Sequence, residues 1–249
     1  LDPRTKILLV TLYIIALFSA KGWMGYAVMA VTLAACVKVS HVGLRALVRG
    51  LKPLVFIIAF TGILNMFFTP DTHYLWEWGI LRVSVKGIEN ALFMVIRIML
   101  LVMGTFLMTY TTSPIRLTDG LESLLNPLKK IHVPVHELAM MMAIALRFIP
   151  TLIEETDKIM SAQKARGADF DSGNIFQKAK ALVPILVPLF ISAFRRADEL
   201  ATAMECRCYH GGEGRTKLHV LKYQRRDYVA LAGGVVILAL VVVLRRLGA

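Results

Sequence analysis

Two arginines stand where long helical stretches end, and their side chains are suited to binding carboxylates. Arg166 lies in the run QKARGA of residues 163–168, and Arg207 lies in the run MECRCY of residues 204–209. An arginine at a helix end can act as a cap, because the free carbonyls and the negative end of the helix dipole attract a cation. Its planar fork can also form two parallel hydrogen bonds with a carboxylate. Two such tips in one chain favour binding to acidic grooves on soluble partners.

The sequence carries no pattern for catalysis or for a bound cofactor. It lacks the G-x-x-x-x-G-K-[S/T] loop, so we expect no ATP site in this chain. Cys206, Cys208 and His210 form a single short group without a second half, and we therefore expect no metal site. No nucleophile stands at a recognisable spacing from a base, so no catalytic residue is assigned. These expectations describe a chain that is not an enzyme and holds no cofactor of its own.

Two long helices must position the arginine tips. The first is predicted from near Pro134 to Arg166, with proline in its opening turn and a glutamate at the positive end of its dipole. The second is predicted from just after residues 171–174, a cluster of N-cap types, to about Arg207. A short amphipathic helix over residues 115–125 is expected to precede them.

Each long helix changes character along its length. Residues 138–149 and 181–194 are apolar, whereas residues 154–166 and 195–207 are charged. The two halves of each helix must therefore meet different environments. The apolar halves could be additional membrane spans, but Arg147 and the nearby prolines make a straight lipid-buried helix less favourable.

The composition is that of a membrane protein. Of the 249 residues, 57% are hydrophobic, which exceeds the roughly 45–50% of soluble domains. The formal net charge is +12, but the aromatic residues lie in apolar runs and do not alternate with basic residues, so no nucleic-acid partner is expected. The predicted fold class is an all-α polytopic membrane protein with about five transmembrane helices plus the long cytoplasmic helices. The predicted spans are residues 7–20, 23–37, 53–68, 91–112 and 228–244, of which the first two form a tight hairpin.

The basic residues predict how the chain is oriented in the cell membrane. Arg4 and Lys6 precede the first span, and four Lys or Arg residues lie within residues 38–52, whereas residues 71–78 contain none. Lys and Arg are retained on the cytoplasmic side of a membrane. The N-terminus should therefore be cytoplasmic, and the loop over residues 71–78 should face outward with its aromatic residues at the outer interface.

The predicted spans divide the chain into three parts. Residues 1–112 form the transmembrane region, residues 113–227 form a cytoplasmic region that holds both long helices, and residues 228–249 contain the final transmembrane helix. With a cytoplasmic N-terminus and five spans, the C-terminus lies outside. This placement puts Arg245 and Arg246 outside, against the charge rule, and a count differing by one span would remove the conflict.

The motifs together resemble those of a known family, the transmembrane T components of energy-coupling factor (ECF) transporters. The likeness covers nearly the whole chain, and it lies in the opening LDPRTK of residues 1–6, the ARG of residues 165–167, and the AMECRCY of residues 203–209 followed by GEGRTK at residues 212–217. The family commonly has ARG at the second motif, where this chain has Cys-Arg-Cys at residues 206–208. The arginine is kept, but the departure puts the local turn geometry in doubt.

The resemblance implies a scaffold in an ABC-type importer for vitamins or metals. It implies two cytoplasmic ATPases that bind the ATP, an exchangeable membrane-embedded substrate-binding subunit (the S component), and a role for the long helices as coupling helices. The residues expected to contact the ATPases are Ala165, Arg166, Gly167, Glu205, Arg207 and Tyr209. The expected S-component platform is apolar and Met-rich, a composition that suits exchange among partners. It comprises Met140, Met141, Met142, Ile144, Leu146, Ile149, Leu186, Leu189 and Phe190.

The rival interpretation is a stand-alone secondary transporter. Such a protein needs internal repeats and polar or broken helices near the middle of the membrane. The polar residues in or beside the predicted spans are few, namely Asn65, Glu89, Asn90 and Arg97, and Glu89 is expected near the outer interface, toward which Arg97 can extend. The sequence therefore favours the scaffold.

Overall fold

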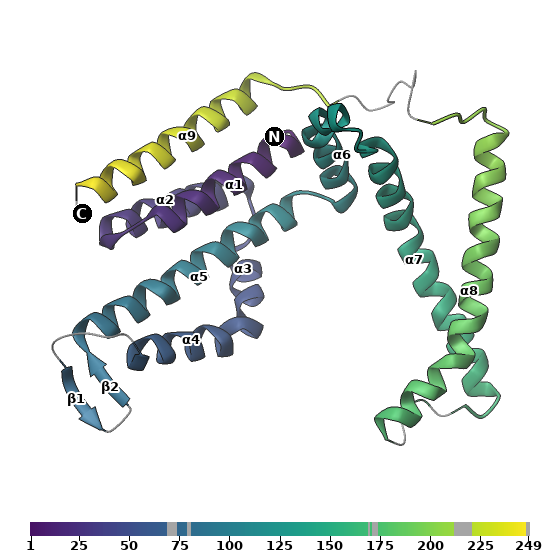
Figure 1. The fold of residues 1–249 in the computed structure, drawn as a ribbon, viewed down its shortest axis with the longest axis horizontal. Helices are drawn as coiled ribbons and strands as arrows, with labels where there is room; N and C mark the ends of the chain where they lie inside the picture. Colours follow the sequence, from purple (N-terminus) through teal and green to yellow (C-terminus); the bar gives the residue numbers. More distant parts are fainter. Residues whose placement is uncertain (69–73, 79–80, 169, 171–173, 212–220, 248–249) are drawn as a thin grey trace. The chain divides into compact units, whose positions relative to one another are not determined.

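The computed structural model describes residues 1–68, 74–78, 81–168, 170, 174–211 and 221–247 (Figure 1). The chain divides into unit 1, Leu1–Leu121 with Leu221–Ala249, and unit 2, Glu122–Val220. The described elements are α1 (Pro3–Ser19), α2 (Gly22–Ser40), α3 (Leu44–Leu51), η1 (Lys52–Leu54), α4 (Val55–Phe68), β1 (Tyr74–Trp78), β2 (Leu81–Ser84), α5 (Val85–Thr111), α6 (Pro114–Leu125), η2 (Asn126–Ile131), α7 (Val135–Ala165), α8 (Ile175–Glu205) and α9 (Arg225–Arg246).

Helices that are long and apolar enough to cross a membrane make up most of the described chain. Six segments meet this description: Gly22–Ser40, Leu44–Phe67, Val85–Thr111, Val135–Ala165, Phe176–Glu205 and Arg225–Arg246. This finding confirms the predicted class, an all-α polytopic membrane protein. The predicted span at residues 7–20 lies in α1, which has 17 residues and is shorter than these six segments. Two of the six are α7 and α8, the long helices whose apolar halves could be further spans.

In unit 1 the structure adds a short helix and a two-stranded sheet to the predicted elements. Residues 38–52, expected to form a basic loop, contain the short helix α3, in which Leu47 and Leu51 are buried while both arginines are exposed. Their spacing of four residues puts the two leucines on one helix face. β1 lies within residues 71–78, expected to be an outer loop, and pairs antiparallel with β2, which follows that loop. Residues 71–73 of that loop lie outside the described residues.

Helix α1 packs against three other helices of unit 1. It forms the expected hairpin with α2, and it also contacts α5 and α9 (Figure 1). Small residues allow this close approach, as is common between membrane helices. A Cβ on Gly104 of α5 would lie 2.5 Å from a ring carbon of Tyr13, and a Cβ on Gly234 of α9 would lie 2.7 Å from a methyl carbon of Leu9.

Arg97 of α5 is held by aromatic side chains of α1 and α2. Its Nε donates a hydrogen bond to the Tyr26 hydroxyl at 2.9 Å. Its guanidinium carbon lies 5.8 Å from the ring centroid of Phe18 and 5.7 Å from that of Tyr26. A hydroxyl acceptor and two ring faces stabilise a guanidinium in an apolar setting. Arg97 therefore joins three helices.

A buried carboxylate connects the beginnings of α1 and α9. Asp227 is 2% exposed. Its Oδ1 accepts a hydrogen bond from the Asp2 N–H at 2.8 Å, and its Oδ2 accepts one from the Gln224 N–H at 2.8 Å. Backbone N–H groups at helix beginnings lack partners within the helix, so one carboxylate satisfies two donors.

Asp227→Ala should destabilise unit 1 by about 3 kcal/mol, because it leaves two partly buried N–H donors without their charged acceptor. Thermal unfolding of the detergent-purified chain should show a lower midpoint for this variant. Glu89→Gln is the control, because Glu89 is an exposed acid in α5. Equal midpoints for the two variants would show that the connection between α1 and α9 does not need the carboxylate.

Candidate functional site: paired helices with arginine tips

Helices α7 and α8 carry the arginine tips within unit 2. Each has 31 residues, and their bounds confirm the two long helices predicted from the sequence. The chain reverses between them, so they pack as an antiparallel pair (Figure 1). α7 continues through Pro150 and α8 continues through Pro184 and Pro188, so the prolines that were expected to disfavour a straight helix do not interrupt either one.

A hydrogen bond from α7 explains how α8 accommodates Pro188. Proline has no N–H, so the carbonyl four residues earlier, that of Pro184, loses its partner within the helix. The side-chain Nε2 of Gln163 donates to this carbonyl at 3.4 Å. The bond attaches the last turn of α7 to α8.

An ion pair joins the two helices where each changes from apolar to charged residues. Arg196 Nη2 lies 3.2 Å from Glu155 Oε2, and the two side chains are 38% and 23% exposed. Glu155 lies 11 residues before Arg166, and Arg196 lies 11 residues before Arg207. The ion pair is therefore equally far along the chain from both arginine tips.

The end of α7 is a Schellman turn centred on Gly167. Gly167 N–H donates to the Lys164 carbonyl at 3.0 Å, and Ala168 N–H donates to the Gln163 carbonyl at 3.0 Å. Gly167 has a φ of +87°, which glycine adopts without a steric penalty. Arg166 is the C-cap residue, immediately before this turn.

The end of α8 repeats this turn with a cysteine in the place of glycine. Cys208 N–H donates to the Glu205 carbonyl at 2.8 Å, and Tyr209 N–H donates to the Met204 carbonyl at 3.1 Å. Cys208 has a φ of +56°, a conformation that costs an L-residue roughly 1–2 kcal/mol. The turn geometry that the Cys-Arg-Cys sequence put in doubt is therefore the same at both ends.

The side chains of Arg166 and Arg207 are exposed, and neither makes an ion pair with another described residue. Backbone N–H groups already bond to the carbonyls of the last turn of each helix. These carbonyls are those of Gln163 and Lys164 in α7 and those of Met204 and Glu205 in α8. The backbone therefore caps both helices without using the guanidinium groups.

The structure does not bring the two arginines together. Arg166 ends α7 beside the connection to α8, whereas Arg207 ends α8 at its far end (Figure 1). Each tip lies 11 residues beyond the ion pair of Glu155 and Arg196, and the two helices run in opposite directions, so roughly 33 Å of helix separates the tips along the pair. The two arginines must therefore contact different surfaces.

The apolar half of each helix leaves a stripe of side chains uncovered within unit 2. Their spacing of three and four residues places each stripe on one helix face. Ile185, by contrast, is 3% exposed and lies on the packed face of α8. The apolar stripes comprise Leu138, Met141, Met142, Ile149 and Ile153 of α7 and Leu182, Val183, Leu186, Val187, Phe190, Ile191 and Phe194 of α8.

Known proteins are similar in sequence to this chain over nearly its full length. The family described as cobalt transport protein, CbiQ, matches residues 1–218. The energy-coupling factor transporter transmembrane protein EcfT of Ruminiclostridium cellulolyticum is 51% identical over 98% of this chain and 91% of its own length. The chain belongs to the EcfT family. The EcfT proteins of Thermosediminibacter oceani and Bacillus subtilis are 55% and 47% identical, over 92% and 98% of this chain and 86% and 92% of their own lengths.

The structure separates the expected contact residues of this EcfT-family chain by exposure. At the tips, Ala165, Gly167 and Glu205 are exposed like the two arginines, and Tyr209 is half-buried. Of the expected platform, the exposed residues are Met141, Met142, Ile149, Leu186 and Phe190, and the half-buried residues are Met140, Ile144, Leu146 and Leu189.

Sequence reasoning missed the contacts that hold the EcfT helix pair together, namely Glu155 with Arg196 and Gln163 with Pro184. Among the described residues, no group of three or more His, Cys, Asp or Glu side chains is placed to hold a metal ion.

Proposed function

We propose that this EcfT-family chain transmits ATP-driven motion from two cytoplasmic ATPases to a membrane-embedded S component during uptake of a vitamin or a metal. The main support is the pair of matching helix ends. Each presents an exposed arginine from a Schellman turn, without an ion-pair partner in the described part of its own chain. Two matching cations at opposite ends of one helix pair suit two partners of one kind, each with an acidic groove.

The two ends of the proposed coupling path use different residues. Ala165, Arg166 and Gly167 would contact one ATPase, and Glu205, Arg207 and Tyr209 would contact the other. The apolar stripes would form the platform for an exchangeable S component, with Met141, Met142 and Phe190 among the residues in contact. Flexible methionine side chains can repack against several partners.

The proposed mechanism is a change in how α7 and α8 cross. ATP binding brings the two ATPases together, which moves one arginine tip relative to the other. The helices are attached through Glu155 and Arg196, so their crossing changes and the platform is displaced. The S component then tilts or leaves. Small sliding and rotation of packed helices are established ways to transmit such changes.

In this proposal the chain itself is not catalytic, requires no cofactor, and has a cytoplasmic N-terminus. The beginning of α1 and the end of α5 meet where Lys6 Nζ donates to the Thr111 carbonyl. Arg225 and Arg226 begin α9, whose first turn is attached to Asp2. These cations gather at one end of the helices of unit 1, as the charge rule requires for a cytoplasmic side.

The proposed function is tested by co-purification. The chain extracted from membranes with a mild detergent should carry two nucleotide-binding subunits and one S component. Calorimetry on the isolated chain should show no micromolar ATP affinity. The control is uptake of radiolabelled substrate by liposomes that contain this chain alone, and uptake there would replace the scaffold by a stand-alone secondary transporter.

A further inference from the structure

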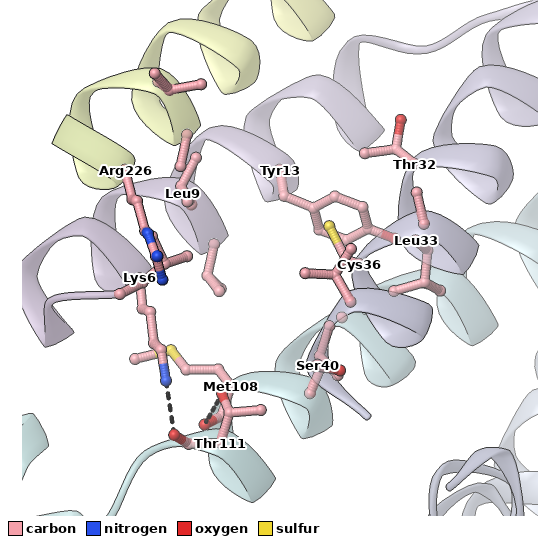
Figure 2. A pocket seen from close by; sticks show the side chains of 18 of the residues that line it. Lys6, Leu9, Tyr13, Thr32, Leu33, Cys36, Ser40, Met108, Thr111 and Arg226 are labelled. Atoms are coloured by element: carbon pink, nitrogen blue, oxygen red, sulfur yellow. Dashed lines mark hydrogen bonds between the residues drawn. The ribbon is translucent and has the colours of Figure 1, made fainter. Parts of the chain in front are cut away.

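A cavity of about 940 Å³ opens within unit 1 among α1, α2, α5 and the beginning of α9 (Figure 2). Its volume is at the upper end of the roughly 300–1,000 Å³ of ligand pockets. Tyr13, Leu33, Cys36 and Met108 line its apolar part. None of the contacts proposed above for the ATPases or the S component involves these residues.

One end of the cavity is basic. Lys6, Arg225 and Arg226 line it, and its described lining residues include no Asp or Glu. Lys6 Nζ donates to the Thr111 carbonyl at 2.6 Å and to Thr112 Oγ1 at 3.1 Å, which leaves one of its three N–H donors for a ligand. Both arginines are exposed, and neither forms an ion pair with another described residue.

The charged and apolar parts lie at different depths along the helices. Figure 2 shows Lys6 and Arg226 at one end of the cavity and Leu33 and Cys36 at the other. Tyr13 follows Lys6 by about two turns of α1, which is roughly 10 Å of helix. The cavity therefore extends from the helix ends, where a membrane interface would lie, into the apolar region.

We propose that this cavity binds one anionic phospholipid. Lys6, Arg225 and Arg226 hold its phosphodiester, and an acyl chain lies along Tyr13 and Cys36. A free phosphate would leave the apolar lining unused, and a zwitterionic lipid would bring a further cation to a site that already has three. Basic pockets between membrane helices on the cytoplasmic side are suited to anionic head groups.

Native mass spectrometry of the full-length chain in detergent tests the proposal. The chain is titrated with phosphatidylglycerol and with phosphatidylcholine of the same acyl chains. We expect a preference of roughly tenfold for phosphatidylglycerol. Lys6→Gln/Arg225→Gln/Arg226→Gln should remove this preference. Lys21→Gln/Arg245→Gln/Arg246→Gln is the matched control, because it removes three positive charges elsewhere in unit 1 and should keep the preference.

A second measurement does not depend on the charge variants folding. In a Cys206→Ser/Cys208→Ser chain, Cys36 is the remaining thiol, and it is exposed in the structure. Phosphatidylglycerol should slow its labelling by a maleimide several-fold more than phosphatidylcholine does. Ala35→Trp, which fills the apolar part of the cavity, should abolish this protection. Equal protection by the two lipids, or equal loss of lipid preference in the two charge variants, would overturn the proposal.

Discussion

Replacing Arg166 and Arg207 together by alanine should abolish ATP-driven uptake while the chain remains folded and inserted in the membrane. The backbone bonds of the two Schellman turns do not involve the arginine side chains, so the helix ends should survive. An arginine buried against a partner carboxylate typically loses about 2–5 kcal/mol on truncation, because the carboxylate is left unpaired. That loss corresponds to roughly 30-fold to several-thousand-fold weaker binding at each tip.

The matched control is Lys158→Ala/Arg195→Ala, which removes two exposed cations from the charged halves of the same helices. This control should retain ATPase binding in a pull-down and should retain uptake. Arg166→Lys/Arg207→Lys separates charge from geometry, since lysine cannot form the two parallel bonds, and it should also weaken binding strongly. Full uptake by the double alanine variant would show that the arginines are dispensable, and the coupling contact would have to lie elsewhere in unit 2.

Phe190→Arg should prevent capture of the S component while the ATPases remain bound. Phe190 is 61% exposed in the middle of the apolar stripe of α8. A central aromatic contact is commonly worth at least about 2 kcal/mol, and an unpaired charge buried in its place costs still more. The ratio of S component to ATPase in the purified complex should therefore fall at least roughly 30-fold.

The control for this variant is Ala197→Arg, which adds the same charge at an exposed position in the charged half of α8. It should leave the composition of the complex unchanged. If the apolar stripes face only lipid, Phe190→Arg will instead impair membrane insertion and will leave S-component capture intact in the inserted fraction. That outcome would show that α8 does not form part of the S-component platform.

The long helices and their tips could be predicted because the signals are local. An apolar run, residues typical of a helix start and an arginine near the end are visible within each stretch, so the approximate bounds of α7 and α8 followed from the sequence. The partners of Glu155 and Gln163 could not be predicted in this way, because they depend on how two helices approach each other in space. The positive φ of Cys208 was hidden for a related reason, since the residue type there favours another conformation.

The exposure of the expected platform residues could not be predicted, because composition does not fix which way each helix face points. Leu186 and Phe190 are exposed whereas Leu189 is half-buried. Val187 and Phe194 lie on the same exposed stripe although they were not among the expected residues. That these residues contact an S component stays a prediction. Helix α3 was not predicted, because its two arginines made residues 38–52 look like a basic loop.

The position of the ion pair determines the mechanical proportions of the helix pair. Arg166 lies about 11 residues beyond Glu155, and Arg207 lies about 11 residues beyond Arg196, which corresponds to about 16 Å of helix in each case. Under the proposed coupling, the two ATPases would push on lever arms of equal length, so neither would have a mechanical advantage over the other. On α7 the opposite arm, from Glu155 back to Met141, is about 21 Å long. Rotation about the ion pair would therefore move the apolar end about one quarter further than the arginine tip.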